Sequence, residues 1–147
     1  MIEQPSLFVV APAQIDMAWR DGAHHLSEAA EKSAGEVTTD QLKLMLARGE
    51  RRLLGLRDLA HPERPPAAWV AVQAMQYPNM RALYVYAIWA PGATCGECMR
   101  LLREYALAEG CLKIRGACGD AVMRLWERRF GARKVYSIVE IDTEVTP

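Results

Sequence analysis

Residues 82–98 read ALYVYAIWAPGATCGEC, and this stretch decides how the chain folds. Ala82–Ala90 is apolar at almost every position, which is typical of a central strand covered on both faces. Pro91 and Gly92 end that strand. A helix is expected to follow, with an apolar face made of Cys98, Leu101, Leu102 and Tyr105. The sequence therefore predicts a strand whose carboxyl end leads through a short loop into the amino end of a helix.

Two more apolar runs precede this strand, over residues 52–59 and 67–77. The second alternates at Trp69, Ala71, Gln73 and Met75. Turn signals separate the three runs, at residues 61–66 and at 78–80. We expect the three strands to form an antiparallel meander.

The amino-terminal part of the chain predicts one strand and then helical structure. Residues 7–11 form a short apolar run that ends at Pro12. Helical spacing follows at Ile15, Trp19 and Leu26. Gly22 interrupts this spacing, so one bent helix and two short helices both fit the pattern.

Clear local signals mark the remaining elements. Residues 38–41, TTDQ, form a capping box that begins a helix, and Gly49 supplies its left-handed end. The helix after Gly92 is expected to end at Gly110. Beyond it we expect a strand over 111–115, a helix capped by Asp120 that ends near Gly131, and a last strand over 135–141.

The resulting order is β-α-α-β-β-β-α-β-α-β, with no internal repeat and no linker. We therefore expect a single domain over residues 1–147 of the α/β class. Its sheet is mixed but mostly antiparallel, with helices on both faces. The β-α-β unit within it must cross over in the right-handed sense.

Composition excludes several classes of function. The chain carries 18 basic and 18 acidic residues, so its formal net charge is zero. Binding to nucleic acid through bulk charge is not expected, because neutralising phosphates needs a basic surplus. No apolar run approaches the ~20 residues that span a bilayer. No secretory signal is visible at the amino terminus, so we expect a cytoplasmic protein.

The element order resembles that of the GNAT acyltransferase superfamily. The closest likeness lies in RLWERRFGA at residues 124–132 and AEGCLKIR at residues 108–115. The sequence also resembles the small GNAT-like proteins of phages and prophages. The resemblance implies a site for acetyl-CoA, a small-molecule acyl donor, between the fourth and fifth strands. The residues that it implies for this site are Ile88, Trp89, Ala90, Gly92, Ala93, Thr94, Cys95, Gly96, Glu97 and Cys98.

Within that resemblance the loop departs from the family pattern. The pantetheine arm would pair with the backbone of 88–90, and the pyrophosphate would bind amides of 92–98. Unpaired amides and a partial positive charge make any helix amino end suited to an anion. The family loop usually begins with Arg or Gln, whereas this loop reads PGATCGEC. Glu97 also adds a carboxylate that competes with a pyrophosphate.

The catalytic residues of the family have no evident counterparts. Trp126 lies near the position where the family often has a Tyr that acts as the general acid. An indole N–H cannot serve as an acid at neutral pH. Residues 82–90 contain no carboxylate that could serve as the base. Cys118 is an alternative acid. The catalytic residues stay unknown.

Two functions therefore remain open. One is an N-acetyltransferase-like enzyme with degenerate motifs. The other is a catalytically silent GNAT-like phage or prophage accessory protein, or virion protein, which acts through protein–protein contacts. The second reading allows a homo-oligomer or a virion partner, and a virion location.

Other residues have both a structural and a functional interpretation. The four cysteines are spaced C-x₂-C-x₁₂-C-x₆-C, which fits small buried side chains better than a zinc or redox site. His24 and His25 fit a solvated helix face, or else a base or metal contact. Trp89 could line a ligand pocket. The basic cluster of residues 124–134 fits a solvated face or an anionic partner.

Overall fold

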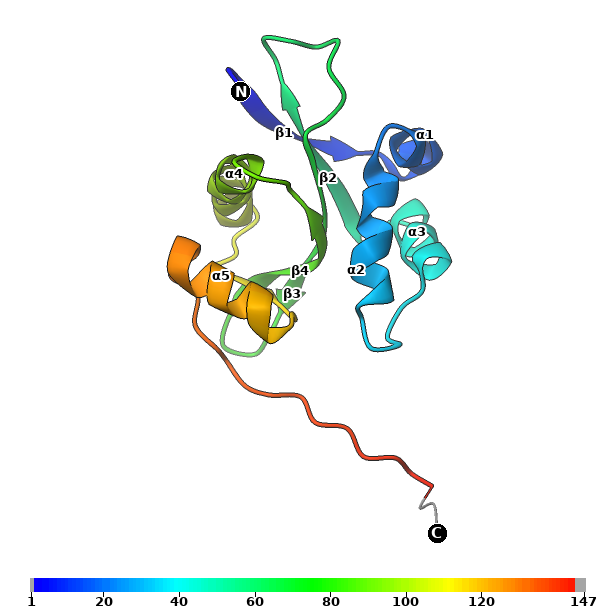
Figure 1. Cartoon of the computed structure of the whole chain (residues 1–147), viewed down its shortest axis with the longest axis vertical. Coiled ribbons are helices and arrows are strands. Elements are labelled where there is room, and N and C mark those ends of the chain that lie inside the picture. Colours follow the sequence, from blue (N-terminus) through cyan, green and yellow to red (C-terminus); the bar gives the residue numbers. More distant parts are fainter. Residues whose placement is uncertain (1, 145–147) are drawn as a thin grey trace. The chain divides into compact units, whose positions relative to one another are not determined.

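A computed structural model describes residues 2–144 of the chain (Figure 1). The chain forms two compact units, one up to Gly116 and one from Ala117 onward. The first unit contains a five-stranded sheet in the order β1-β2-β3-β4-β5. Its strands are β1 (Pro5–Val10), β2 (Arg52–Asp58), β3 (Ala68–Gln76), β4 (Arg81–Trp89) and β5 (Lys113–Gly116).

The pairing of the strands confirms the predicted mixed sheet. Strands β1 to β4 form antiparallel pairs along the chain, and β4 pairs with β5 in parallel. The connection from β4 to β5 is helix α4, as parallel neighbours require.

Helices cover both faces of this sheet (Figure 1). On one face lie η1 (Pro12–Gln14), α1 (Ile15–Arg20), η2 (Ala23–Leu26), α2 (Ser27–Glu31) and α3 (Thr39–Ala47). Helix α4 (Thr94–Ala108) covers the other face. It buries Cys98, Met99, Leu102 and Ala106.

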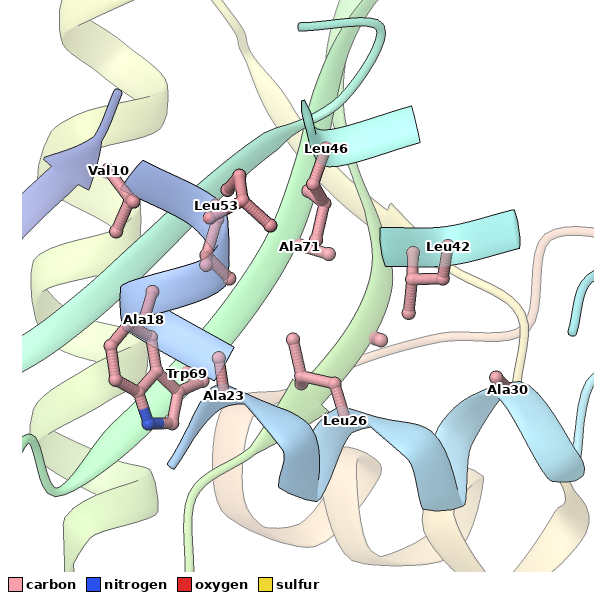
Figure 2. Packing of buried hydrophobic residues seen from close by; sticks show 12 residues of the cluster. Val10, Ala18, Ala23, Leu26, Ala30, Leu42, Leu46, Leu53, Trp69 and Ala71 are labelled. Atoms are coloured by element: carbon pink, nitrogen blue, oxygen red, sulfur yellow. The ribbon is translucent and has the colours of Figure 1, made fainter. Parts of the chain in front are cut away.

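The best-packed core lies between the sheet and the amino-terminal helices (Figure 2). Leu26, Leu42 and Leu46 from the helices meet Leu53 and Trp69 from the sheet. Each of these side chains is at most 1% exposed. Fully burying a side chain of this size stabilises the fold by about 1.5–3 kcal/mol. This cluster therefore fixes the helices over β2 and β3.

Gly22 divides the helical region into separate short helices. Its φ of 132° is accessible almost only to glycine. A Cβ at this position would lie 3.0 Å from Nε1 of Trp69, so the backbone packs directly on the indole. The sequence allowed a bent helix or two short ones, and the break at Gly22 produces short ones.

Helix α3 begins as predicted. The Thr38 hydroxyl accepts a hydrogen bond from the Gln41 amide at 3.2 Å, and the Gln41 side chain accepts one from the Thr38 amide at 2.9 Å. This confirms the capping box. Gly49 follows the helix with a φ of 74°, which confirms the left-handed end.

Asp58 is the buried carboxylate at the end of β2. It accepts hydrogen bonds from the amides of Glu3, Gln4 and Ala60 at 2.9–3.0 Å. These bonds, that from Glu3 first, hold the pKa of Asp58 below its ordinary value against the opposing effect of burial. They also tie the start of β1 to the end of β2.

The strand expected at 111–115 begins two residues later, at Lys113. The reason is the end of α4, where the Cys111 amide donates to the Ala106 carbonyl at 2.8 Å. Gly110 has a φ of 76°, so it ends the helix as predicted. Cys111 thus belongs to the end of the helix and not to the strand.

The second unit differs most from the expectation. Helix α5 (Asp120–Phe130) ends at Gly131, as predicted. Its N-cap is Gly119, so the prediction that Asp120 caps the helix was wrong. The strand predicted over 135–141 was also wrong, because these residues have no strand partner and a strand cannot form without one. Their apolar side chains are exposed, up to 87% at Ile141.

Candidate functional site

Strand β4 is irregular near its middle. Ala71 of β3 lies opposite Ala87, but the next residue, Val72, lies opposite Val85. Tyr86 is therefore an extra residue, a β-bulge in β4. A bulge bends its strand and increases the local twist, and bulges often lie next to active sites.

The pairing of β4 with β5 stops at the same place. It joins Ala82–Val85 to Lys113–Gly116. Among the described residues no strand pairs with β4 beyond Val85 on that side, so the backbone of 86–89 forms an open edge. Gly116 marks the last close approach, because a Cβ there would lie 3.2 Å from the Val85 carbonyl oxygen. The strands part at the bulge.

The loop after β4 leads into the amino end of α4. Gly92 adopts a φ of 59°, which permits the tight turn. The first amides of the helix make only long bonds to this turn: Thr94 donates to Pro91 at 3.2 Å and Cys95 to Gly92 at 3.3 Å. Ala93 is the N-cap residue, and no side chain caps the helix there. The amide end thus retains capacity for an anion.

Glu97 does not stand as an isolated carboxylate in this first turn. Arg100 donates to it at 3.0 and 3.2 Å and also reaches Glu104 at 3.4 Å. An exposed pair of this kind contributes little to stability, about 0.3–0.5 kcal/mol. It does place a positive charge next to Glu97, which offsets the competition with an anion that the sequence suggested.

The cysteines differ from one another in their surroundings. Cys98 is fully buried, and its burial raises the pKa of the thiol to about 12. It is therefore neither a thiolate nor a side chain available to a ligand. Cys111 is buried too, as predicted, whereas Cys95 is partly exposed and Cys118 is exposed. The expectation of four buried cysteines was thus wrong for two of them.

Of the predicted site residues, Ile88 and Trp89 end β4, and Ala90 follows directly. Gly92 and Ala93 form the turn, and the remaining predicted residues, Thr94, Cys95, Gly96, Glu97 and Cys98, lie in the first turns of α4. The fold thus brings the open edge and the amide end together along a short stretch of chain. That a ligand binds there stays a prediction.

Aromatic rings lie beside this stretch on the face of the amino-terminal helices. His25 stacks on Trp89, with ring centroids 4.2 Å apart and planes at 8°. His24 lies 4.4 Å from His25, and its Nδ1 donates to the Trp19 carbonyl at 2.9 Å. Trp89 is thereby held on the face of the sheet that the amino-terminal helices cover.

A second group of side chains surrounds the bulge, and sequence reasoning did not find it. The Arg51 guanidinium lies 3.4 Å from the Tyr86 ring centroid. The Tyr86 hydroxyl donates to Gln73 at 3.2 Å, and the ring centroids of Tyr84 and Tyr86 lie 4.7 Å apart. The register that gathers these residues depends on the bulge, which leaves no periodic signal in the sequence.

Other candidate groups are engaged elsewhere. Tyr105 accepts a hydrogen bond from Arg52 on the α4 side of the sheet, and burial raises its pKa. Trp126 and Cys118 lie in the second unit.

Within residues 2–144 no group of three His, Cys, Asp or Glu side chains is arranged to hold a metal ion. Over the same residues, no helix has the length and apolar character that crossing a membrane requires.

Several solved acetyltransferases have a similar fold. An aminoglycoside acetyltransferase from an uncultured soil metagenomic sample, solved with sisomicin, gives a TM-score of 0.63 at 8% identity over 97% of both chains. Glucosamine-6-phosphate N-acetyltransferase from Arabidopsis thaliana gives 0.58 at 14% identity, over 95% of this chain and 99% of its own. A predicted acetyltransferase from Clostridium acetobutylicum, solved with acetyl-CoA, gives 0.57 at 13% identity, over 95% and 96%.

No protein-family model matches the sequence, and neither does any curated protein. Identities this low carry information about the fold and not about the reaction. The likeness nevertheless extends over nearly the whole of each chain. The chain therefore has the fold of the GNAT acetyltransferases.

Proposed function

We propose that this chain is an N-acyltransferase that takes its acyl group from acetyl-CoA. One observation carries the proposal: β5 no longer pairs with β4 from Tyr86 onward, and the amide end of α4 follows a few residues after β4 ends. A ligand made of an extended amide-containing arm and a pyrophosphate matches these two features in the same order. Acetyl-CoA, with which the Clostridium acetobutylicum acetyltransferase was solved, has this composition.

The residues present fit such a ligand. Backbone N–H and C=O groups of 86–89 can pair with the amides of the arm as a neighbouring strand would. Amides of the turn and first turn of α4, at Ala93 and Gly96, can bind the pyrophosphate. When bound, the cofactor supplies the acyl group as a thioester. The contributions of the chain itself are to hold the arm straight and to fix the phosphates.

Proton transfer would depend on residues that differ from those usual in the family. Since β4 contains no carboxylate, a base on this strand is absent from the sequence. Tyr86 is the ionisable side chain at the bulge, and its hydroxyl is oriented by Gln73. We place it as the candidate acid that protonates the departing thiolate of the cofactor. Backbone amides around the bulge are the candidate donors to an oxyanion.

Calorimetry and thermal unfolding with acetyl-CoA test this function. Binding at a concentration of one hundred times Kd stabilises the fold by about 2.7 kcal/mol, which raises the melting temperature by several degrees. Pantetheine and ADP, each containing one half of the ligand chemistry, should bind far more weakly than acetyl-CoA. The absence of any shift at millimolar acetyl-CoA would end the proposal.

A second candidate is a catalytically silent protein that acts through protein contacts, as a phage or prophage accessory or virion protein would. The observation that favours it is the apolar surface of the second unit, in which α5 buries no residue. Large exposed apolar patches are typical of interaction surfaces. The exposed side chains are Val122, Leu125, Val135, Tyr136, Ile138, Val139 and Ile141.

Light scattering after size-exclusion chromatography separates the two candidates. If the protein is catalytically silent, we expect an oligomer that the double variant Ile138→Asp, Ile141→Asp converts to monomers. We also expect no change in melting temperature on addition of acetyl-CoA. A monomeric wild-type protein that transfers acetyl groups would contradict it. An oligomer that also binds acetyl-CoA would leave the enzyme proposal standing and assign the apolar surface to assembly.

A further inference from the structure

Arg51 is a partly exposed cation without an anionic partner. Its guanidinium lies over the Tyr86 ring, and among residues 2–144 no carboxylate comes within ion-pair distance of it. Its neighbours in sequence differ from it. Arg48 pairs with Glu50 at 4.0 Å, and Arg52 pairs with Glu109 at 3.0 Å.

The surroundings of Arg51 are aromatic and neutral. Tyr86 lies below it, and Gln73 and Met75 contact the Tyr86 hydroxyl at 3.2 and 3.8 Å. Stacking on an aromatic face holds a guanidinium in place without neutralising its hydrogen-bonding edge. The five N–H donors of an arginine match the oxygens of a phosphate or carboxylate.

Arg51 also stands at a defined point relative to the proposed ligand site, so the inference rests on the proposed function. With phosphates at the amide end of α4, an arm lying along 86–89 runs back toward the bulge. Four strand residues extend about 13 Å, so the far end of the arm would reach Tyr86. The acceptor amine must approach at this end, beside Arg51.

We propose that Arg51, stacked on Tyr86, binds an anionic group of the acceptor, a phosphate or a carboxylate carried by a small primary amine. A polycationic acceptor such as an aminoglycoside is disfavoured by the same positive charge. The acceptor class is thus an amine of mixed charge and not an amine that carries only positive charge.

Equilibrium binding tests the inference without requiring turnover. Calorimetry compares glucosamine 6-phosphate with glucosamine, and 4-aminobutyrate with butylamine, so that the phosphate and carboxylate arms are separate. The wild-type protein should bind at least one of the two amines that carry an anionic group about tenfold or more tightly than the matching amine that lacks this group. Arg51→Gln should remove that preference, and Arg51→Lys should retain part of it.

Arg57→Gln is the matched control. The Arg57 guanidinium also stacks on an aromatic ring, 3.9 Å from the Phe8 centroid, but on the β1–β2 side of the sheet. This variant should bind like the wild type. If Arg51→Gln keeps the preference, or the wild type shows none, the inference is overturned. Arg51→Gln should bind acetyl-CoA like the wild type, so failure of the acceptor site and failure of the donor site give different results.

Discussion

The amide end of α4 allows stability and ligand binding to be changed in opposite directions. Ala93 is exposed, it is the N-cap residue, and no side chain caps the helix. Ala93→Asp adds a carboxylate beside the positive end of the helix. This charge should stabilise the free protein by about 0.3–1 kcal/mol.

The same carboxylate should weaken acetyl-CoA binding. Two unit charges about 6 Å apart repel each other by about 3 kcal/mol at an effective dielectric constant of 20, before screening by salt. Screening at physiological ionic strength reduces this, so we expect about tenfold to hundredfold weaker binding. The loss should shrink as salt concentration rises.

Urea unfolding without ligand and calorimetry with acetyl-CoA measure the two effects separately. Ala93→Asn is the control, because it has nearly the same shape and no charge, and should bind acetyl-CoA close to the wild-type affinity. If Ala93→Asp binds acetyl-CoA as tightly as the wild type, the phosphates do not lie at the amide end of α4. A loss of both stability and binding would instead indicate damage to the fold.

Three further predictions concern the fold that holds the site. Gly55→Ala would place a Cβ 2.3 Å from the Phe8 ring, so it should cost about 1–3 kcal/mol and lower the melting temperature by several degrees. Thr38→Ala removes the capping box of α3 and should cost about 1 kcal/mol in urea unfolding. The pKa of Asp58 is lower in the folded than in the unfolded chain, so its stabilisation is complete above the unfolded pKa and is lost as pH falls through the folded value. Asp58→Asn should therefore flatten the loss of stability below about pH 4 in thermal melts, and an unchanged acid profile would contradict this.

The sequence predicted the sheet well because the elements of the first unit carry local signals. The capping box at Thr38, the left-handed glycines at 49 and 110, and the continuous apolar run of β4 each act within a few residues. Tertiary contacts do not override such signals here. The predicted bounds of β2, β3 and β4 accordingly differ from the structure by one residue at most.

The predicted strand at 135–141 rested on composition alone, and strand formation needs a partner that composition does not supply. For a similar reason, only part of the candidate site could be predicted from the sequence. Its backbone features follow from the break at Pro91, which is local. The bulge at Tyr86 and the stacking of Arg51 depend on the register between β3 and β4, which no single stretch encodes.

Hydrogen exchange of the backbone amides, followed by mass spectrometry with and without acetyl-CoA, tests the central claim most directly. We predict slower exchange for residues 86–96, which include the open edge of β4 and the amide end of α4. Peptides from β1 and α3 should exchange at unchanged rates. Protection confined to other segments, or none at saturating acetyl-CoA, would contradict the placement of an acyl donor where β4 and β5 part.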